Sequence, residues 1–249
     1  MTAPRYAYAV GRVLDPADLA GLVGIDGAEV CQVAHRELAA VVSAAPPDEA
    51  ALGARLERLD ELAVVAEAHH SVVAAVAART VVVPLRLGTI YRDEDRVREL
   101  LRERYEGFEA LLARLAGTVE VGVKLYAQDR SPAPAAPGAS GRAYLLQLSQ
   151  RHRRREQEWQ EAAAAVERVD TALGAYALDS SRHRPQPAQL SGAAGENVLN
   201  AAYLVPAGRL AEFGELAERL ALGEPLLRIE VTGPWAPYSF TEPDRGDRT

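Results

Sequence analysis

The chain has few residues of several types, and each scarcity restricts what the protein can be. Its 249 residues include a single cysteine, Cys31, so no disulfide can form within the chain and a reducing compartment is expected. No uninterrupted run of about 18 apolar residues occurs, which argues against a transmembrane helix. The first ten residues, MTAPRYAYAV, lack the basic start and continuous apolar segment of a secretory signal. We therefore expect a cytoplasmic protein.

Positive charge is also in short supply. Lysine and arginine total 28 against 35 aspartates and glutamates, which gives a formal net charge of −7 and a pI near 5.4. This balance argues against binding nucleic acid or an anionic membrane through the surface as a whole. We expect no nucleic-acid partner and no membrane attachment, and any basic segment has to act locally.

Residue patterns typical of catalysis or metal binding are missing as well. His69 and His70 are adjacent, so on a helix they point about 100° apart and lack the i, i+4 spacing with which two imidazoles share a metal. The glycines at 21, 24 and 27 do not follow the spacing of a phosphate-binding loop, and no Gly-x-Ser-x-Gly elbow occurs. Cys31 has no base beside it in sequence and is interpreted as a core residue. We expect no enzymatic activity, no metal and no cofactor.

What the chain does contain begins with a clear compositional boundary. Residues 128–141, QDRSPAPAAPGASG, are rich in proline and alanine and resemble a stiff linker. The prediction is an α+β protein with an N-terminal α+β domain over residues 1–127 and a C-terminal domain over 142–232. Residues 233–249 follow as an aromatic arm and a disordered tail.

The N-terminal domain is predicted to be a mixed sheet with helices on one side. Alternating and β-branched segments indicate strands, and apolar residues at spacings of three and four indicate helices. The expected strands are Arg5–Gly11, Glu29–Ala34, Glu37–Ser43, Val81–Val83 and Thr118–Tyr126. The expected helices are Asp48–Arg79 and Asp93–Ala116.

The C-terminal domain is predicted to be ferredoxin-like with a long N-terminal helix. That helix is expected from about Gly141 to Ala172, and it is followed by strand, strand, helix and strand, an order typical of a ferredoxin-like half-sandwich. These later elements are expected near Tyr176–Ser181, Asn197–Val205, Gly208–Leu222 and Leu226–Thr232.

The long helix carries the strongest local charge signal. Residues 151–155 read RHRRR, and both His152 and Arg155 fall on an otherwise apolar seam, where unpaired burial would be costly. This part of the helix is therefore expected to project beyond the domain or to meet an acidic partner, with Arg153, Arg154 and Trp159 as candidate partner-binding residues. An RNA-binding interpretation needs further stacking aromatics, and only Trp159 is near.

The end of the chain concentrates aromatic residues. Trp, Tyr and Phe supply 14 of the 249 residues, and Trp235, Tyr238 and Phe240 fall within six positions. Because Pro234 and Pro237 remove backbone donors, the segment after Thr232 is expected to leave its sheet as an irregular arm. The three aromatics either pack on the protein's own domain, which is the favoured interpretation, or are offered to a partner.

Four segments, taken in order, resemble the gas vesicle GvpF/GvpL family. They read VVVPLRLGTIY at 81–91, GRAYLLQ at 141–147, NAAYLVP at 200–206 and GPWAPYSF at 233–240. The similarity spans nearly the whole chain, and the four together are far more specific than PLRLGT alone. The first segment includes a bend marked by Pro84, Arg86, Gly88 and Thr89.

The resemblance implies two α+β domains of ferredoxin-like character and a role as an accessory or minor structural protein of gas vesicles. It also implies association with the small hydrophobic shell protein during assembly, contact with other gas vesicle accessory proteins, and location at the gas vesicle. The alternative is a ferredoxin-like module that binds a small ligand or RNA without catalysis, using the basic run of the long helix. An enzyme would need a convergent set of titratable groups that the sequence does not display.

Overall fold

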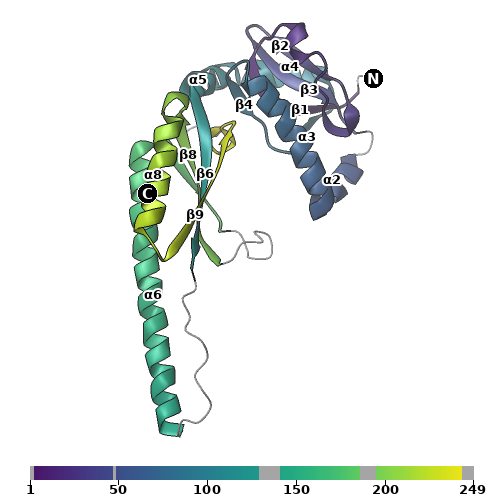
Figure 1. Ribbon diagram of the computed structural model, residues 1–249. Helices are drawn as coiled ribbons and strands as arrows, with labels where there is room; N and C mark the ends of the chain where they lie inside the picture. Colours follow the sequence, from purple (N-terminus) through teal and green to yellow (C-terminus); the bar gives the residue numbers. More distant parts are fainter. Residues whose placement is uncertain (1–2, 47–48, 129–140, 186–194, 243–249) are drawn as a thin grey trace. The chain divides into compact units, whose positions relative to one another are not determined.

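The structure, a computed structural model, describes residues 3–46, 49–128, 141–185 and 195–242 (Figure 1). Its chain divides into two compact units. The first contains residues 1–120 and 235–249, and the second contains residues 121–234. Both divisions fall inside strands, and each unit is described here by itself.

The first unit is built on an antiparallel sheet with the strand order β2-β3-β1-β4, in which β5 also pairs with β1. Its strands are β1 (Arg5–Arg12), β2 (Val30–His35), β3 (Leu38–Ala44), β4 (Val82–Pro84) and β5 (Ile90–Tyr91). All its described pairings are antiparallel, so the expectation of a mixed sheet was wrong. A two-residue turn at Arg36 and Glu37 reverses the chain between β2 and β3, and β3 then lies between β2 and β1, so that neighbouring strands run in opposite directions.

The helices of the first unit are shorter than the sequence predicted. They are α1 (Pro16–Leu19), the 3₁₀ turn η1 (Ile25–Gly27), α2 (Glu49–Glu57), α3 (Leu59–Ala77), α4 (Glu94–Glu103) and α5 (Tyr105–Leu115). Two long helices were expected, and each is broken once. Arg58 takes extended angles of φ −102° and ψ 120°, and Arg104 takes φ −109° and ψ 19°. The apolar periodicity continues across both breaks, which is why it did not reveal them.

Both faces of this sheet are covered, not one face as expected. Residues of β1 and β3 are buried consecutively rather than alternately, which requires packing on each side. On one side, Tyr6 and Tyr8 of β1 join Val73 and other residues of α3 in a core cluster. The other helical pair, α4 and α5, contacts β2, β3 and β4.

The second unit has a sheet with the order β7-β8-β6-β9. Its elements are β6 (Thr118–Ala127), α6 (Gly141–Tyr176), β7 (Asp179–His183), β8 (Glu196–Pro206), η2 (Ala207–Arg209), α8 (Leu210–Gly223) and β9 (Leu227–Trp235). In chain order these strands lie second, third, first and fourth, the arrangement of a ferredoxin-like βαββαβ unit. The sheet of the first unit repeats this order with β1 to β4.

The placement of β6 corrects the sequence prediction. Thr118–Tyr126 was assigned to the N-terminal domain because a proline-rich segment follows it. In the structure β6 instead lies between β8 and β9, so it is the first strand of the second sheet. Residues 128–141 therefore connect a strand to the next helix of the same unit. The predicted linker itself falls almost wholly outside the described residues.

The core of the second unit lies between the sheet and its two helices. Alternate residues of β6 (Val121, Val123 and Leu125) pack with Val169 and Leu173 of α6 in one buried cluster, as the alternation of that strand predicts. Figure 1 shows α6 and α8 on the same face of this sheet. The buried amide of Asn197 donates to the carbonyls of Leu125 (3.1 Å) and Leu199 (2.9 Å).

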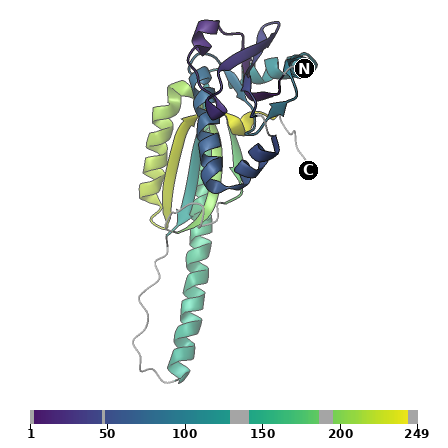
Figure 2. The same ribbon diagram turned by 90° about the vertical axis from the view of Figure 1, so that its right-hand side faces the viewer.

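Helix α6 is much longer than the sheet it covers. Its first half extends beyond the sheet in both views (Figures 1 and 2), and among the α6 side chains that the structure describes, Ala162 is the first that is buried. No helix in the described parts of the chain is long and apolar enough to cross a membrane.

We predict that Leu173→Ala destabilises the protein by about 2–5 kcal/mol, because Leu173 is fully buried in the second unit and truncation leaves a cavity. The matched control is Leu222→Ala on α8, where the side chain is 86% exposed and a change within about 0.5 kcal/mol is expected. Urea unfolding followed by circular dichroism measures both. Equal losses in the two variants would contradict the observed core.

Candidate functional site: the aromatic arm and the bend

The aromatic arm begins inside the last strand instead of after it. The sequence predicted that pairing stops at Thr232, but β9 continues to Trp235. Proline is tolerated there because β9 is an edge strand, where a missing N–H leaves no ladder bond broken. The arm then closes with the 3₁₀ turn η3 (Tyr238–Phe240).

The arm packs on the first unit, in keeping with the favoured interpretation of its aromatics. Phe240 is 3% exposed. Ala236 and Tyr238 belong to the cluster formed by β1 and α3. Among the three aromatics of the arm, Trp235 is the most accessible, with 39% of its surface exposed. The arm thus exposes the side chain of Trp235, while its other aromatic residues, Tyr238 and Phe240, pack against the first unit.

A buried carboxylate anchors the middle of the arm. Glu120, 8% exposed, accepts the backbone N–H of Ser239 at 2.7 Å and its hydroxyl at 2.8 Å. Hydrogen bonds to an ionised acceptor are about twice as strong as neutral ones. These two bonds also give a buried charge its necessary partners. Glu120 therefore fixes both the position and the orientation of η3.

The bend that the sequence marked lies beside the arm. Glu242, the last described residue, forms an ion pair with Arg86 of the bend. Within the bend, the hydroxyl of Thr89 donates to the Arg86 carbonyl at 2.6 Å. Gly88 has a φ of +80°, a conformation that strongly favours glycine. Pro84, paired with Ala9, ends β4 at the edge of the sheet. The bend and the end of the arm, 156 residues apart at the Arg86–Glu242 contact, thus form one surface.

A buried hydroxyl joins the bend to the core beneath the arm. The Tyr6 hydroxyl accepts the N–H of Gly88 at 2.9 Å and is hydrogen-bonded to Nδ1 of His69 at 3.0 Å. The rings of Tyr8 and Tyr238 lie 5.4 Å and 6.1 Å from the His69 ring. This aromatic cluster connects β1, α3, the bend and the arm, and the sequence did not indicate that His69 would belong to it.

Burial controls the ionisation of this cluster. Desolvation lowers the pKa of His69 from 6.5 to about 4 and raises the pKa of Tyr6 to about 12. Desolvation also raises the pKa of Tyr238. These groups are therefore neutral near pH 7. The neighbouring histidine, His70, is the one that contacts the exposed aromatic residue of the arm. The ring of His70 meets Trp235 edge-on, with centroids 4.8 Å apart.

The candidate residues of the long helix lie in the second unit. Arg153 and Trp159 are exposed on α6, and Trp159 has 54% of its surface accessible. The side chain of Arg154 lies outside the described structure. The structure brings the arm and bend residues together in the first unit, whereas Arg153 and Trp159 belong to the second unit.

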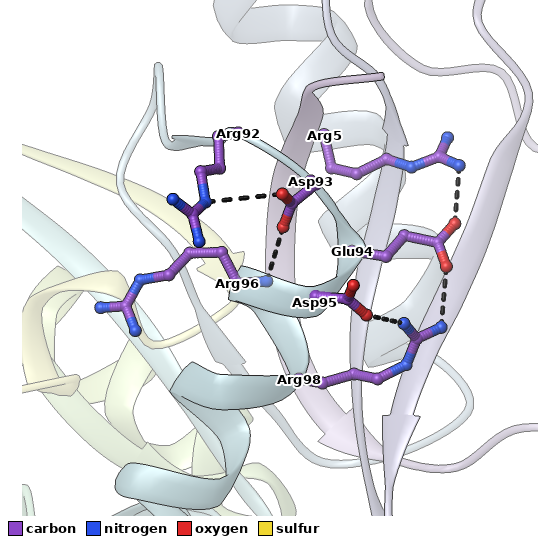
Figure 3. Close-up of polar contacts among 7 residues, drawn as sticks. All are labelled: Arg5, Arg92, Asp93, Glu94, Asp95, Arg96 and Arg98. Carbon is purple, nitrogen blue, oxygen red and sulfur yellow. Dashed lines mark hydrogen bonds and ion pairs between the residues drawn. The ribbon is translucent and has the colours of Figure 1, made fainter. Parts of the chain in front are cut away.

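A third charged surface was not selected from the sequence. At the start of α4, Asp93 accepts the N–H of Arg96 at 2.8 Å as an N-cap, while Glu94 pairs with Arg5 (2.6 Å) and Arg98 (2.8 Å) (Figure 3). The run DEDR after Tyr91 is the signal for this cap. Exposed pairs of this kind contribute little to stability. The cations shown here are matched by carboxylates, so we assign no ligand to this surface.

The second sheet offers no aromatic platform at the position that an RNA-binding interpretation would use. Tyr126 of β6 is fully buried, and the Arg228 guanidinium lies 4.1 Å from its ring centroid. Stacking of bases needs an accessible aromatic face. Within the described ranges, no group of three or more His, Cys, Asp or Glu side chains is arranged to hold a metal ion.

Comparison with solved structures identifies the class of fold. The chain resembles the crystal structure of the gas vesicle protein GvpF from Anabaena sp. PCC7120, with a TM-score of 0.69 and 18% identity over all of both chains. It also resembles GvpF from Microcystis aeruginosa, with a TM-score of 0.66 and 21% identity over 97% of this chain and all of the other. The α+β fold is therefore that of the GvpF structures.

Sequence comparison gives the family. The model of the family described as "Gas vesicle synthesis protein GvpL/GvpF" matches residues 4–242. Gas vesicle protein L of Streptomyces sp. (strain CB03234) is 46% identical over 95% of this chain and 92% of its own length. Gas vesicle protein F of the same strain is 29% identical over 95% and 99%. Gas vesicle protein F2 of Halobacterium salinarum is 26% identical over 95% and 92%. The chain belongs to the gas vesicle GvpL/GvpF family.

We predict that Ser239→Ala loosens the arm, because it removes one of the two bonds to the buried Glu120 carboxylate. A loss of about 1.5–3 kcal/mol is expected for a hydrogen bond to a charged group. In a Trp159→Phe background, Trp235 is the single tryptophan, and its quenching by acrylamide should increase. Thr241→Ala is the control, since its hydroxyl bonds only to the Tyr238 carbonyl within the turn. Unchanged quenching in Ser239→Ala would contradict the anchor.

We predict that His69 makes stability depend on pH. Its folded pKa of about 4 lies below the ordinary 6.5, so between these values the unfolded chain binds the extra proton. The free energy of unfolding should be fully retained above pH 6.5 and fall by up to about 3 kcal/mol as pH approaches 4. Urea titrations at several pH values should show a shallower fall for His69→Phe. Parallel pH profiles of the two proteins would rule out His69 as the cause.

Proposed function

We propose that this protein is an accessory or minor structural component of gas vesicles that binds the small hydrophobic shell protein and supports assembly. Membership of the GvpL/GvpF family over residues 4–242 is the observation that carries the proposal. A subunit that turns an apolar face towards gas has to hide that face before it polymerises, because exposed apolar patches and open strand edges aggregate. A partner with a fixed apolar contact surface meets this need.

The arm surface supplies such a contact. Trp235 is held at its base by the buried residues of the arm and on one side by the His70 ring. Little side-chain entropy is therefore lost when it binds. Rigid tryptophans surrounded by packed residues are the side chains that most often dominate protein interfaces. Tyr238 and Phe240 were also candidates from the sequence. They pack in the core beneath the arm, so their contribution to binding is to hold Trp235 in position.

We predict that Trp235→Ala together with His70→Ala abolishes retention of the shell protein. The test is co-expression with the small shell protein from the same gene cluster, followed by affinity purification and quantification of the soluble complex. At least a tenfold loss is expected, equivalent to about 1.4 kcal/mol. Alanine at Tyr238 or Phe240 would be a poor test, because those side chains are part of the core and their loss threatens the fold.

The chain provides its own control in Trp159→Ala, which removes the other tryptophan from the second unit. This variant should retain the shell protein as the intact chain does. If the intact chain fails to keep the shell protein soluble, direct binding is refuted. If Trp159→Ala abolishes retention and the arm variant does not, the contact has been placed on the wrong unit.

A further inference from the structure

Helix α3 has an exposed stripe on the side opposite to the one that packs on the sheet. Its buried residues include Val65, Val72 and Val76. Residues spaced by three and four positions on a helix lie on one face, and one such series runs along the outer side of α3 to its C-cap. This outer stripe consists of Val64, Glu67, Ser71, Ala74 and Ala78, which are all exposed. The Val64 side chain has 62% of its surface accessible.

The outer stripe carries very little charge for a surface helix. Within residues 62–78, Glu67 is the single Asp, Glu, Lys or Arg, whereas a chain with 25% charged residues would place about four in a segment of that length. By contrast, α8 exposes three glutamates and an arginine between residues 212 and 219. A helix with apolar residues on all sides is usually covered on all sides. The outer stripe therefore has the composition of a surface that a partner covers.

The outer stripe adjoins the exposed aromatic residue of the arm. The ring of His70 meets that of Trp235 edge-on, with centroids 4.8 Å apart. His70 belongs to α3, and it precedes Ser71 and lies one helical turn before Ala74. Side chains four residues apart on a helix are neighbours. A partner that covers Trp235 would therefore also reach the stripe.

The charge and the size of the stripe indicate which partner covers it. A basic partner would meet a single carboxylate there, and an acidic partner would meet no cation among the five side chains. The five side chains of one helix offer roughly a few hundred Å², whereas a stable pair of proteins buries about 800 Å² on each partner. A small contact area fits a transient partner better than a second copy of this chain. The small hydrophobic shell protein fits both criteria, because its apolar face can cover the stripe without desolvating many charges.

We propose that the outer stripe of α3 is part of the contact with the shell protein and selects for an uncharged partner surface. This inference rests on the proposed function and extends it from Trp235 to Val64, Ser71 and Ala74. The small side chains of Ser71 and Ala74 allow the partner to approach the helix closely. A charged partner surface would lose its hydration against the stripe without gaining ion pairs, which disfavours the wrong partner.

The test introduces either sign of charge into the stripe of the full chain and repeats the co-expression with the shell protein. Ala74→Glu and Ala74→Lys should each reduce the retained shell protein at least tenfold, because either charge would be buried without a partner. Glutamate and lysine are both good helix formers, so the two variants should keep the helix content of the intact chain in circular dichroism. Glu67→Ala should retain as much shell protein as the intact chain or more, because it removes the one charge from the contact.

The matched controls are Ala110→Glu and Ala110→Lys on α5 of the same unit, where the alanine is also exposed. Both should retain the shell protein as the intact chain does. The proposal is overturned if only one sign of charge at Ala74 reduces retention, if Glu67→Ala reduces it, or if the Ala110 variants lose as much. It is also overturned if sedimentation shows that the chain pairs with itself and that Ala74→Glu separates the pair.

Two further outcomes separate this inference from the proposed function. If the intact chain does not retain the shell protein, the proposed function and the α3 contact are both refuted. If Trp235→Ala with His70→Ala abolishes retention while both Ala74 variants preserve it, the arm contact stands and the α3 contact alone is refuted.

Discussion

The buried hydroxyl of Tyr6 is the constraint on which the first unit depends. It lies in the core of the sheet and needs polar partners there, because an unsatisfied buried hydroxyl is costly. One partner comes from the bend, through the N–H of Gly88, and the other from α3, through His69. Tyr238 of the arm packs against the same cluster. A single strand residue thereby joins segments from the beginning, the middle and the end of the chain.

The two sheets share one strand order but are completed differently. In the second unit, the helices α6 and α8 follow β6 and β8 and cover the sheet as in a ferredoxin-like fold. In the first unit, the connection between β1 and β2 contains only α1 and η1. Coverage is supplied by α2 to α5 and by the returning arm, whose residues belong to this unit by their contacts. The arm therefore completes the packing of the first unit, and this packing determines which of its side chains remain exposed.

Three charged or aromatic surfaces differ in how far their own unit satisfies them. Around the start of α4, arginines face carboxylates of neighbouring turns and of β1, so the surface is internally neutralised (Figure 3). At the arm, the ring of Trp235 contacts that of His70, and 39% of the Trp235 surface is exposed. On the first half of α6, the described side chains are exposed. Exposed apolar surface is where association lowers the free energy most, which ranks the arm above the start of α4 as a contact surface.

The sequence by itself determined the α+β class, the order of nearly all elements, the exposed position of Trp159 and the bend at Gly88. These follow from local periodicity and from residues with restricted or unusual backbone angles, which act over a few positions. The helix breaks at Arg58 and Arg104 were not predicted, because the apolar periodicity continues across both of them. Only the tertiary structure decided that β6 belongs to the second sheet and that the arm closes the first unit. Those outcomes depend on contacts such as Ser239 with Glu120, 119 residues apart, and a local pattern carries no information about which distant strand or carboxylate will be the partner.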